Sequence, residues 1–306
     1  MRQHLRTLLV IYFGCVVFTL AHVLPGNLIS KARSNDSDTP DLKITNIERL
    51  NSPADEADPC IAPGGAAFYF SRGTGSGTEI MVAIRRDKSQ PFSNPTPIEE
   101  LNGSEACSPF PMPREADGSE YIFFATKGEP GNLDIYFTRR LRPTEPFQRI
   151  AKAPVHQVCT PEDETHPWVS PDSREMYFSR KTKEGWRIGY ARGSAPRSFE
   201  NVTLLDFPPG FSHATISKDG TLMILQGPIE DNKLGLFASK RGSKSGPWGK
   251  PQPIVSLNSK LSTKGESSPS LSADGQFLYF ASDRPGGKGG LDLYFVSTSE
   301  LKKGGL

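Results

Sequence analysis

The side chains that could do chemistry recur at one place in five related segments of the chain. The segments align on a proline or its equivalent: Pro59, Pro109, Pro167, Ala214 and Pro269. The residue before it is polar in every segment: Asp58, Ser108, His166, His213 and Ser268. Three positions before it, three of the five segments carry a carboxylate: Glu56, Glu164 and Glu266. If the segments surround a common axis, these residues form two stacked polar rings.

Such rings predict a site for a polar ligand at the axial mouth. Two imidazoles near carboxylates are a donor set for a divalent metal, and convergent polar groups can also hold a sugar or a peptide. The expected ligand-binding residues are Asp58, Ser108, His166, His213, Ser268, Glu164 and Glu266. A metal site, if there is one, would use His166, His213 and Asp58, and no other cofactor is indicated. Alternatively, these side chains only bind nearby backbone and water around a solvent-filled channel.

Short strands must position these residues. Each segment has a strand candidate at the proline, a second one dense in aromatic and aliphatic residues, such as Phe277–Phe280, and a third after a turn. The aligned positions lie 50, 58, 47 and 55 residues apart, and a period of about 50 residues is typical of four-stranded propeller blades with loops. The predicted fold is an all-β, five-bladed β-propeller of four-stranded antiparallel blades.

The outer strand of each blade is expected between the segments. Pro97–Asn102 recurs as Pro253–Asn258, with weaker versions at Phe147–Ile150 and Val202–Leu205. The last segment has no such strand behind it, whereas Ile47–Asn51 before the first segment matches the pattern. We therefore expect an N-terminal strand to close the last blade, which removes an open sheet edge.

The best-preserved segment contains Ser272-Ala273-Asp274-Gly275, then Leu278–Ser282, then Asp283-Arg284-Pro285-Gly286-Gly287. It resembles the WD40-like (TolB-like, PD40) β-propeller repeats of exported bacterial proteins. The resemblance implies a propeller over nearly all of residues 42 to 300, and a scaffold that binds a protein, a peptide or a glycan. The favoured interpretation is an exported, non-catalytic binding or scaffold module, with catalysis left open.

A carbohydrate-active hydrolase is the alternative. Carboxylates at an axial mouth resemble the arrangement in five-bladed glycoside hydrolases, where an acid and a base need carboxyl groups about 5–10 Å apart. The catalytic candidates would be Glu56, Glu164 and Glu266. Equivalent positions in a repeat usually share a structural role, which argues against them.

The N-terminus indicates export. Residues 1–24 hold a short basic region and an apolar run over residues 7–24, typical of a signal peptide or a signal anchor. Residues 25–41 are polar and predict a flexible linker, followed by the propeller domain over residues 42–306. The expected location is the periplasm or the cell surface, with a membrane tether if the apolar run is retained.

Charge and cysteine content exclude other classes. The 36 basic and 34 acidic residues are spread along the chain and give a net charge of +2. The sequence therefore has no basic block that would indicate binding of nucleic acid. The four cysteines are too far apart for a paired zinc motif. A Cys107–Cys159 disulfide is one interpretation, and buried or incidental cysteines are the other.

Overall fold

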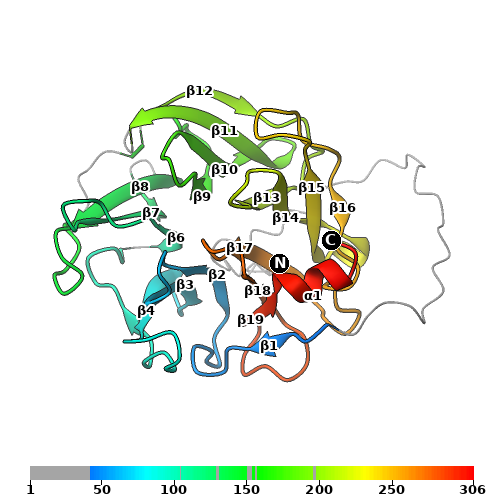
Figure 1. The fold of residues 1–306 in the computed structure, drawn as a ribbon, viewed down its shortest axis with the longest axis horizontal. Helices are drawn as coiled ribbons and strands as arrows, with labels where there is room; N and C mark the ends of the chain where they lie inside the picture. Colours follow the sequence, from blue (N-terminus) through cyan, green and yellow to red (C-terminus); the bar gives the residue numbers. More distant parts are fainter. Residues whose placement is uncertain (1–41, 104, 129–130, 150–153, 156, 196–197) are drawn as a thin grey trace, which may run out of the picture.

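Five small antiparallel sheets follow one another around a central axis (Figure 1). This is a computed structural model, which describes residues 42–103, 105–128, 131–149, 154–155, 157–195 and 198–306. The predicted signal segment (residues 1–24) and linker (residues 25–41) lie outside the described residues. The five-bladed propeller predicted from the repeats is confirmed.

Blades 1 to 4 are each built from consecutive strands, numbered from the axis outward, and blade 5 takes its outer strand from the start of the described chain. Blade 1 holds β2 (Glu56–Ile61), β3 (Ala67–Gly73), β4 (Thr78–Ile84) and β5 (Thr96–Pro97), and blade 2 holds β6 (Ala106–Pro111), β7 (Glu120–Lys127) and β8 (Leu133–Arg140). Blade 3 holds β9 (Glu164–Val169), β10 (Glu175–Thr182), β11 (Gly185–Ala195) and β12 (Ser198–Leu204). Blade 4 holds β13 (Ser212–Ile216), β14 (Leu222–Pro228), β15 (Leu234–Lys240) and β16 (Gln252–Pro253). Blade 5 holds β17 (Glu266–Leu271), β18 (Phe277–Ser282), β19 (Asp292–Ser297) and β1 (Thr45–Asn46).

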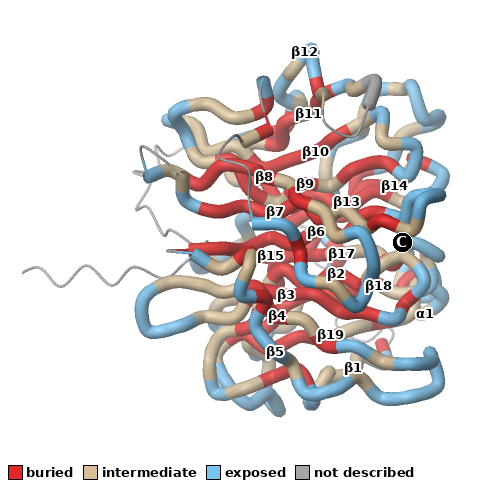
Figure 2. The backbone as a smooth tube through the Cα atoms, turned by 90° about the vertical axis from the view of Figure 1, so that its left-hand side faces the viewer, coloured by how far each residue is buried: buried red, intermediate tan, exposed pale blue. Residues whose placement is uncertain are grey.

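The core lies between the blades rather than within them. Successive residues of a strand face opposite sides of its sheet, so a strand in the middle of a blade packs against both neighbouring blades. In β7, Phe123 packs toward blade 3 and Phe124 toward blade 1, and both are fully buried. Buried strands and exposed connecting loops are seen in Figure 2. This two-sided burial explains why the second strand of each repeat has consecutive apolar residues.

The chain closes the ring at blade 5. Strand β1 pairs antiparallel with β19, with Thr45 opposite Phe295. The rings of Phe68 in blade 1 and Tyr279 in blade 5 lie edge to face with 5.1 Å between centroids. The prediction of an N-terminal strand in the last blade is confirmed, but the strand is Thr45–Asn46, a little before the expected Ile47–Asn51.

An asparagine after the outer strand ties it to the third strand of the same blade. The side-chain oxygen of Asn102 accepts from the Ile80 N–H at 2.7 Å, and its amide donates to the Ile80 carbonyl at 3.2 Å. Asn258 makes the same two bonds with Leu236 in blade 4. The recurring Asn of the sequence pattern is therefore structural, because it satisfies backbone groups that a two-residue outer strand leaves unpaired.

In blade 2 this position is occupied by Cys159. The N–H of Ile135 donates to the Cys159 sulfur at 3.3 Å, and the thiol lies 3.6 Å from the Ile135 carbonyl oxygen. The N–H of Val155 bonds the same carbonyl, as Ile98 does with Ile80 in blade 1. The prediction that Phe147–Ile150 supplies the outer segment of blade 2 is wrong, because Val155 and Cys159 fill that position.

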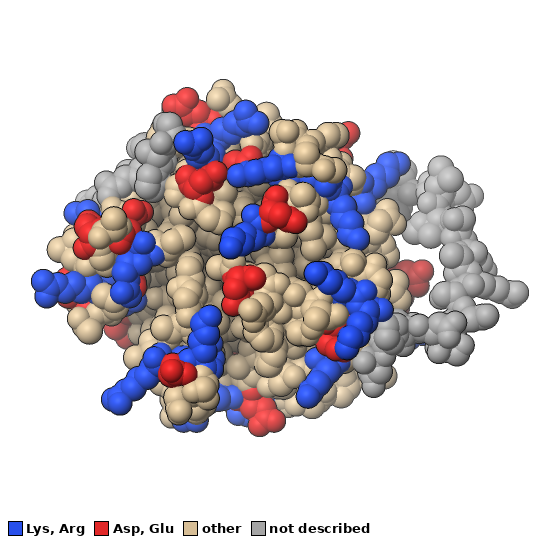
Figure 3. Space-filling model, in the orientation of Figure 1, with Lys and Arg blue, Asp and Glu red and all other residues tan. Residues whose placement is uncertain are grey.

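Two short helices complete the described chain: the 3₁₀ turn η1 (Glu230–Asn232) and α1 (Thr298–Lys303). Among the described residues no helix is both long and apolar enough to cross a membrane. On the face of the propeller in Figure 3, basic and acidic side chains are mixed rather than gathered into a patch of one sign.

Candidate functional site at the propeller axis

A distortion repeated in all five innermost strands turns one side chain of each blade toward the axis. The pairing register shifts at this point in every blade, as in a β-bulge. The five residues at the bulge all have positive φ, between 50° and 56°: Asp58, Ser108, His166, His213 and Ser268. Left-handed backbone is uncommon for residues other than glycine and costs about 1–3 kcal/mol each. Bulges of this kind re-aim side chains next to functional sites.

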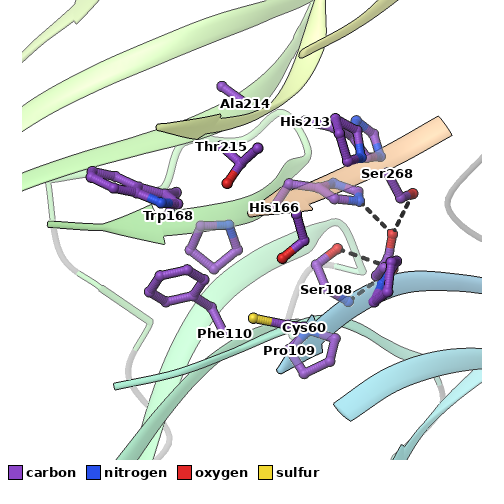
Figure 4. Close-up of a pocket in the computed structure, with 15 residues that line it drawn as sticks. Cys60, Ser108, Pro109, Phe110, His166, Trp168, His213, Ala214, Thr215 and Ser268 are labelled. Carbon is purple, nitrogen blue, oxygen red and sulfur yellow. Dashed lines mark hydrogen bonds and ion pairs between the residues drawn. The ribbon is translucent and has the colours of Figure 1, made fainter. Parts of the chain in front are cut away.

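These five residues line one pocket (Figure 4). The structure thus brings together the five polar positions that the repeat alignment selected. The residue two positions further along each strand adds a second ring to the lining: Cys60, Phe110, Trp168, Thr215 and Ser270. Phe110 and Trp168 contribute an aromatic wall, with ring centroids 6.4 Å apart.

Asp58 is the charged centre of the pocket. One carboxylate oxygen, Oδ2, accepts from the Ser71 hydroxyl at 2.7 Å and from the Ser108 N–H at 3.0 Å. The other, Oδ1, is 2.7 Å from Nε2 of His166 and accepts from the Ser268 hydroxyl at 2.9 Å. The donors come from blades 1, 2, 3 and 5, so a single carboxylate links four blades at the axis.

Burial by itself raises the pKa of Asp58. The charge and hydrogen bond of His166, with further contributions from His213 and Ser71, outweigh it and hold the pKa of this carboxyl well below its usual range. Asp58 is therefore an anion at neutral pH, although only 6% of it is exposed. Such a buried and perturbed carboxylate in a pocket is a candidate functional group.

The two histidines come from adjacent blades and converge beside Asp58. Their ring centroids are 3.1 Å apart. Nδ1 of His166 is 2.8 Å from the Thr165 hydroxyl, and Nδ1 of His213 is 2.9 Å from the Ser212 hydroxyl. Burial and the neighbouring His166 lower the pKa of His213 well below the usual value, whereas Asp58 acts in the opposite direction. His213 is thus a neutral imidazole at physiological pH.

The predicted glutamates do not belong to the pocket lining. Each is buried and pairs with an arginine in or just after the second strand of its own blade: Glu56 with Arg72 at 2.8 Å, Glu164 with Arg180 at 2.7 Å and Glu266 with Arg284 at 3.1 Å.

The arginines in turn donate to the carbonyls of Leu50, Val158 and Leu257, which hold the loop before the first strand. Carboxylates committed in this way are poorly placed to exchange protons with a ligand on the axis. The geometry therefore argues against Glu56, Glu164 and Glu266 as an acid–base set, and against Glu164 and Glu266 as ligand contacts.

Of the two interpretations of the cysteines, the Cys107–Cys159 disulfide is wrong. Cys159 is a free cysteine, and its sulfur instead takes part in the backbone contacts of blade 2. Cys60 in the pocket lining is also free, and burial raises the pKa of its thiol to about 12, so it is an unreactive thiol at neutral pH.

Two aromatic residues of the pocket, Phe110 and Trp168, were not selected from the sequence. Each directly follows the aligned proline, Pro109 or Pro167. Their position could have been predicted from the alternation of side chains along a strand, because a residue two positions after one axial residue faces the axis again. A β-bulge adds a residue to the strand and changes which positions share a face, so the alternation is hard to follow in the sequence.

Comparisons with known proteins place this site in a wider structural context. No family model matches the chain. A search of curated proteins finds no match either. Solved structures do match, at low sequence identity. A thermostable family-43 glycoside hydrolase is 16% identical, with a TM-score of 0.60, 83% of this chain covered and 92% of that one.

Two further matches have the same architecture. The GH43_1 enzyme from Xanthomonas citri, solved with xylotriose, is 13% identical, with a TM-score of 0.60 and coverage of 84% of this chain and 90% of the other. An endo-arabinase from Bacteroides thetaiotaomicron is 13% identical, with a TM-score of 0.59 and coverage of 82% and 95%. At such identities the matches establish a shared fold.

These findings correct two expectations. The relationship to the WD40-like (TolB-like) repeat family is contradicted, because no family model matches and the similar structures are five-bladed propellers of carbohydrate-processing enzymes. The interpretation as a non-catalytic binding or scaffold module is contradicted by the same matches, whose fold this chain shares and which are named as enzymes. The Ser-x-Asp pattern behind the resemblance forms a local turn, in which the Ser272 hydroxyl donates to Asp274 at 2.7 Å.

Proposed function

We propose that this chain is a carbohydrate-active enzyme that hydrolyses a glycosidic bond of an oligosaccharide bound at the axial pocket. The observation that carries the proposal is the buried anionic Asp58, which shares its pocket with an aromatic wall. The fold supports it, because the similar solved structures are named as glycoside hydrolases, one of them in complex with xylotriose.

The residue types of the pocket lining suit contact with a sugar. The part-exposed aromatic faces of Phe110 and Trp168 can pack against the apolar C–H face of a pyranose or furanose. The axial cavity itself, about 40 Å³, admits one small group of the sugar beside the buried hydroxyls of Ser108, Thr215 and Ser268. Ligand sites typically combine such apolar walls with a few polar groups that fix orientation. This combination favours an uncharged oligosaccharide over an anionic one, since the axial group is itself an anion.

Asp58 is the residue that we assign to the chemistry. Glycoside cleavage passes through an oxocarbenium-like transition state, and a carboxylate beside the anomeric carbon stabilises its positive charge or takes a proton from the attacking water. Among the described residues that line the pocket, Asp58 is the single carboxylate. The proton for the leaving oxygen must then come from another titratable group, and we assign this role to the imidazole of His166, whose Nε2 is 2.7 Å from Asp58.

The test is turnover of a panel of neutral pentose and hexose oligosaccharides, including xylotriose and arabino-oligosaccharides, with products identified by chromatography. Asp58→Asn should lower kcat at least 100-fold, the typical size of a lost acid–base group. Trp168→Ala should raise KM about tenfold with a smaller effect on kcat.

The matched control is Asp219→Asn, an equivalent change in an exposed turn where Asp219 accepts from Ser217. It should keep wild-type turnover. Folding of every variant is checked by circular dichroism. Absence of wild-type turnover on the whole panel would overturn the hydrolase proposal, and unchanged turnover in a folded Asp58→Asn variant would overturn the role of Asp58.

The apolar run of residues 7–24 supports placing this activity outside the cytoplasm, in the periplasm or at the cell surface. Fractionation of cells that express the full chain, with N-terminal sequencing of the mature protein, tests this and shows whether the segment is removed.

A further inference from the structure

We infer that Asp58, His166 and His213 form a binding site for one divalent transition-metal ion, and that the ion is Zn²⁺ or a metal of similar preference. The inference goes beyond the proposed hydrolysis and does not depend on it, because an ion could bind here whether or not the protein cleaves glycans. It rests on three observations: the convergence of the donor atoms, the orientation of the imidazoles, and the burial of the set.

The donor atoms converge from three separate blades. One carboxylate oxygen of Asp58 and one ring nitrogen of each histidine all lie within 4.8 Å of one another. Zinc–nitrogen bonds of about 2.0–2.1 Å place tetrahedral ligands about 3.3 Å apart, so the donor atoms are within reach of one ion once the two rings, now 3.1 Å apart, separate around it. Three protein ligands with a remaining open position are the usual arrangement of an accessible zinc site.

Hydrogen bonds on the far side of each ring hold the imidazoles in place. Nδ1 of His166 contacts the Thr165 hydroxyl, and Nδ1 of His213 contacts the Ser212 hydroxyl. Nε2 of His166 faces the Asp58 carboxylate at 2.7 Å. Among the described residues, Nε2 of His213 has no hydrogen-bond partner. Metal-bound histidines typically have the other ring nitrogen fixed in this way.

The ligand types select the metal class. Ca²⁺ and Mg²⁺ prefer sites built from many oxygen atoms, whereas imidazole suits zinc, copper, nickel and iron. Nε2 of His166 and Oδ1 of Asp58 already face each other at 2.7 Å, so two of the three donor atoms are adjacent.

A second group of possible ligands lies between blades 2 and 3 and serves as the comparison. Asp134, Cys159 and Glu164 also bring their donor atoms within 4.8 Å. Glu164 is already paired with Arg180, Cys159 contacts the backbone of Ile135, and burial raises the pKa of the Cys159 thiol. These groups are committed to other partners, so we assign no ion to them.

The experiment measures Zn²⁺ binding to the full chain after treatment with a chelator, by competition with a chromogenic chelator and by elemental analysis. The wild type should bind one equivalent. His213→Asn should weaken binding at least 100-fold, and asparagine suits the left-handed backbone at this position. Ser212→Ala should weaken it about tenfold, the range observed for residues that orient a ligand. Cys159→Ser is the matched control and should bind as the wild type does.

Co²⁺ loaded into the wild type provides a readout that needs no variant. A tetrahedral visible spectrum without a thiolate charge-transfer band is expected for this nitrogen and oxygen set. Failure of the wild type to bind one equivalent, undiminished binding by His213→Asn, or loss of binding in Cys159→Ser would each overturn the inference. Turnover is measured separately on the same samples, so Zn²⁺ binding without hydrolysis counts against the proposed function alone.

Discussion

Exchanging Cys159 for asparagine should stabilise the protein. In blades 1 and 4 the equivalent Asn102 and Asn258 each make two hydrogen bonds to the backbone of the third strand, at 2.7 and 3.2 Å. Cys159 makes the same two contacts with Ile135, but at 3.3 and 3.6 Å and through a sulfur, which is a weak donor and a weak acceptor.

The size of the stability change follows from the stronger hydrogen bonds that an asparagine amide makes in place of the thiol. An ordinary intramolecular hydrogen bond contributes about 0.5–1.5 kcal/mol net. Because the thiol already satisfies part of this requirement, we expect Cys159→Asn to raise the free energy of unfolding by about 1 kcal/mol. For a chain of this size that corresponds to a rise in Tm of about 2–4 °C. The reverse change in blade 1, Asn102→Cys, should lower stability by a similar amount.

The assay is guanidinium denaturation of both variants and the wild type under reducing conditions, with calorimetry for Tm. Opposite shifts in the two variants support the equivalence of Cys159 and Asn102. A Cys159→Asn variant less stable than the wild type, or an Asn102→Cys variant of unchanged stability, would refute it.

Three further outcomes are expected. Asp58→Asn should lower the free energy of unfolding by about 1.5–3 kcal/mol, because it weakens the buried hydrogen bonds that this carboxylate accepts from Ser71, Ser108 and Ser268; a loss below 1 kcal/mol in denaturant titrations would contradict this. Burial raises the pKa of Asp283, but hydrogen bonds from Ser262, Thr263 and the backbone outweigh it and lower this pKa to about 2. The ionised Asp283 therefore stabilises the fold fully above about pH 4, the pKa of an aspartate in the unfolded chain, and this stabilisation is lost as the pH falls toward 2. Discounted for solvent exposure, that contribution is about 1 kcal/mol, and the stability difference between wild type and Asp283→Asn, compared at pH 6 and pH 2, should shrink at the lower pH. Glu164→Gln should lower stability without lowering kcat in the folded fraction, since Glu164 pairs with Arg180 and lies outside the pocket lining; a specific loss of kcat would return it to the active site.

The repeat spacing predicted the fold because a blade is a local unit. Its strands, turns and apolar alternation lie within about 50 residues, so sequence patterns report them directly. The alignment on the proline also selected the five axial residues, because each lies at the same position in its strand. Closure of the ring followed from counting outer strands, although β1 lies slightly before the segment that was expected.

Other features of the site depend on contacts between residues that an alignment of the repeats does not show. The arginine that pairs with Glu164 is 16 residues away in the next strand, and only the folded sheet shows that this bond turns the carboxylate away from the pocket. The left-handed backbone at His166 and its equivalents has no sequence signature, because these positions hold none of the glycines that usually mark positive φ. The role of Cys159 was missed because its residue type differs from that of its equivalents.

Comparing equivalent positions in the five blades distinguishes residues with a structural role from candidate ligand-binding residues. Glu56, Glu164 and Glu266 are alike in residue type and in partner, each bound to an arginine of its own blade, as expected for a bond that every such blade needs. The five axial positions share a strained backbone but hold an aspartate, two serines and two histidines. A purely structural requirement would select the same side chain each time, or glycine, which adopts this backbone without strain. The axial set is asymmetric instead, with its anion on one side and both imidazoles on adjacent blades, and such asymmetry is what recognition of a single ligand at the centre of a near-symmetric ring requires.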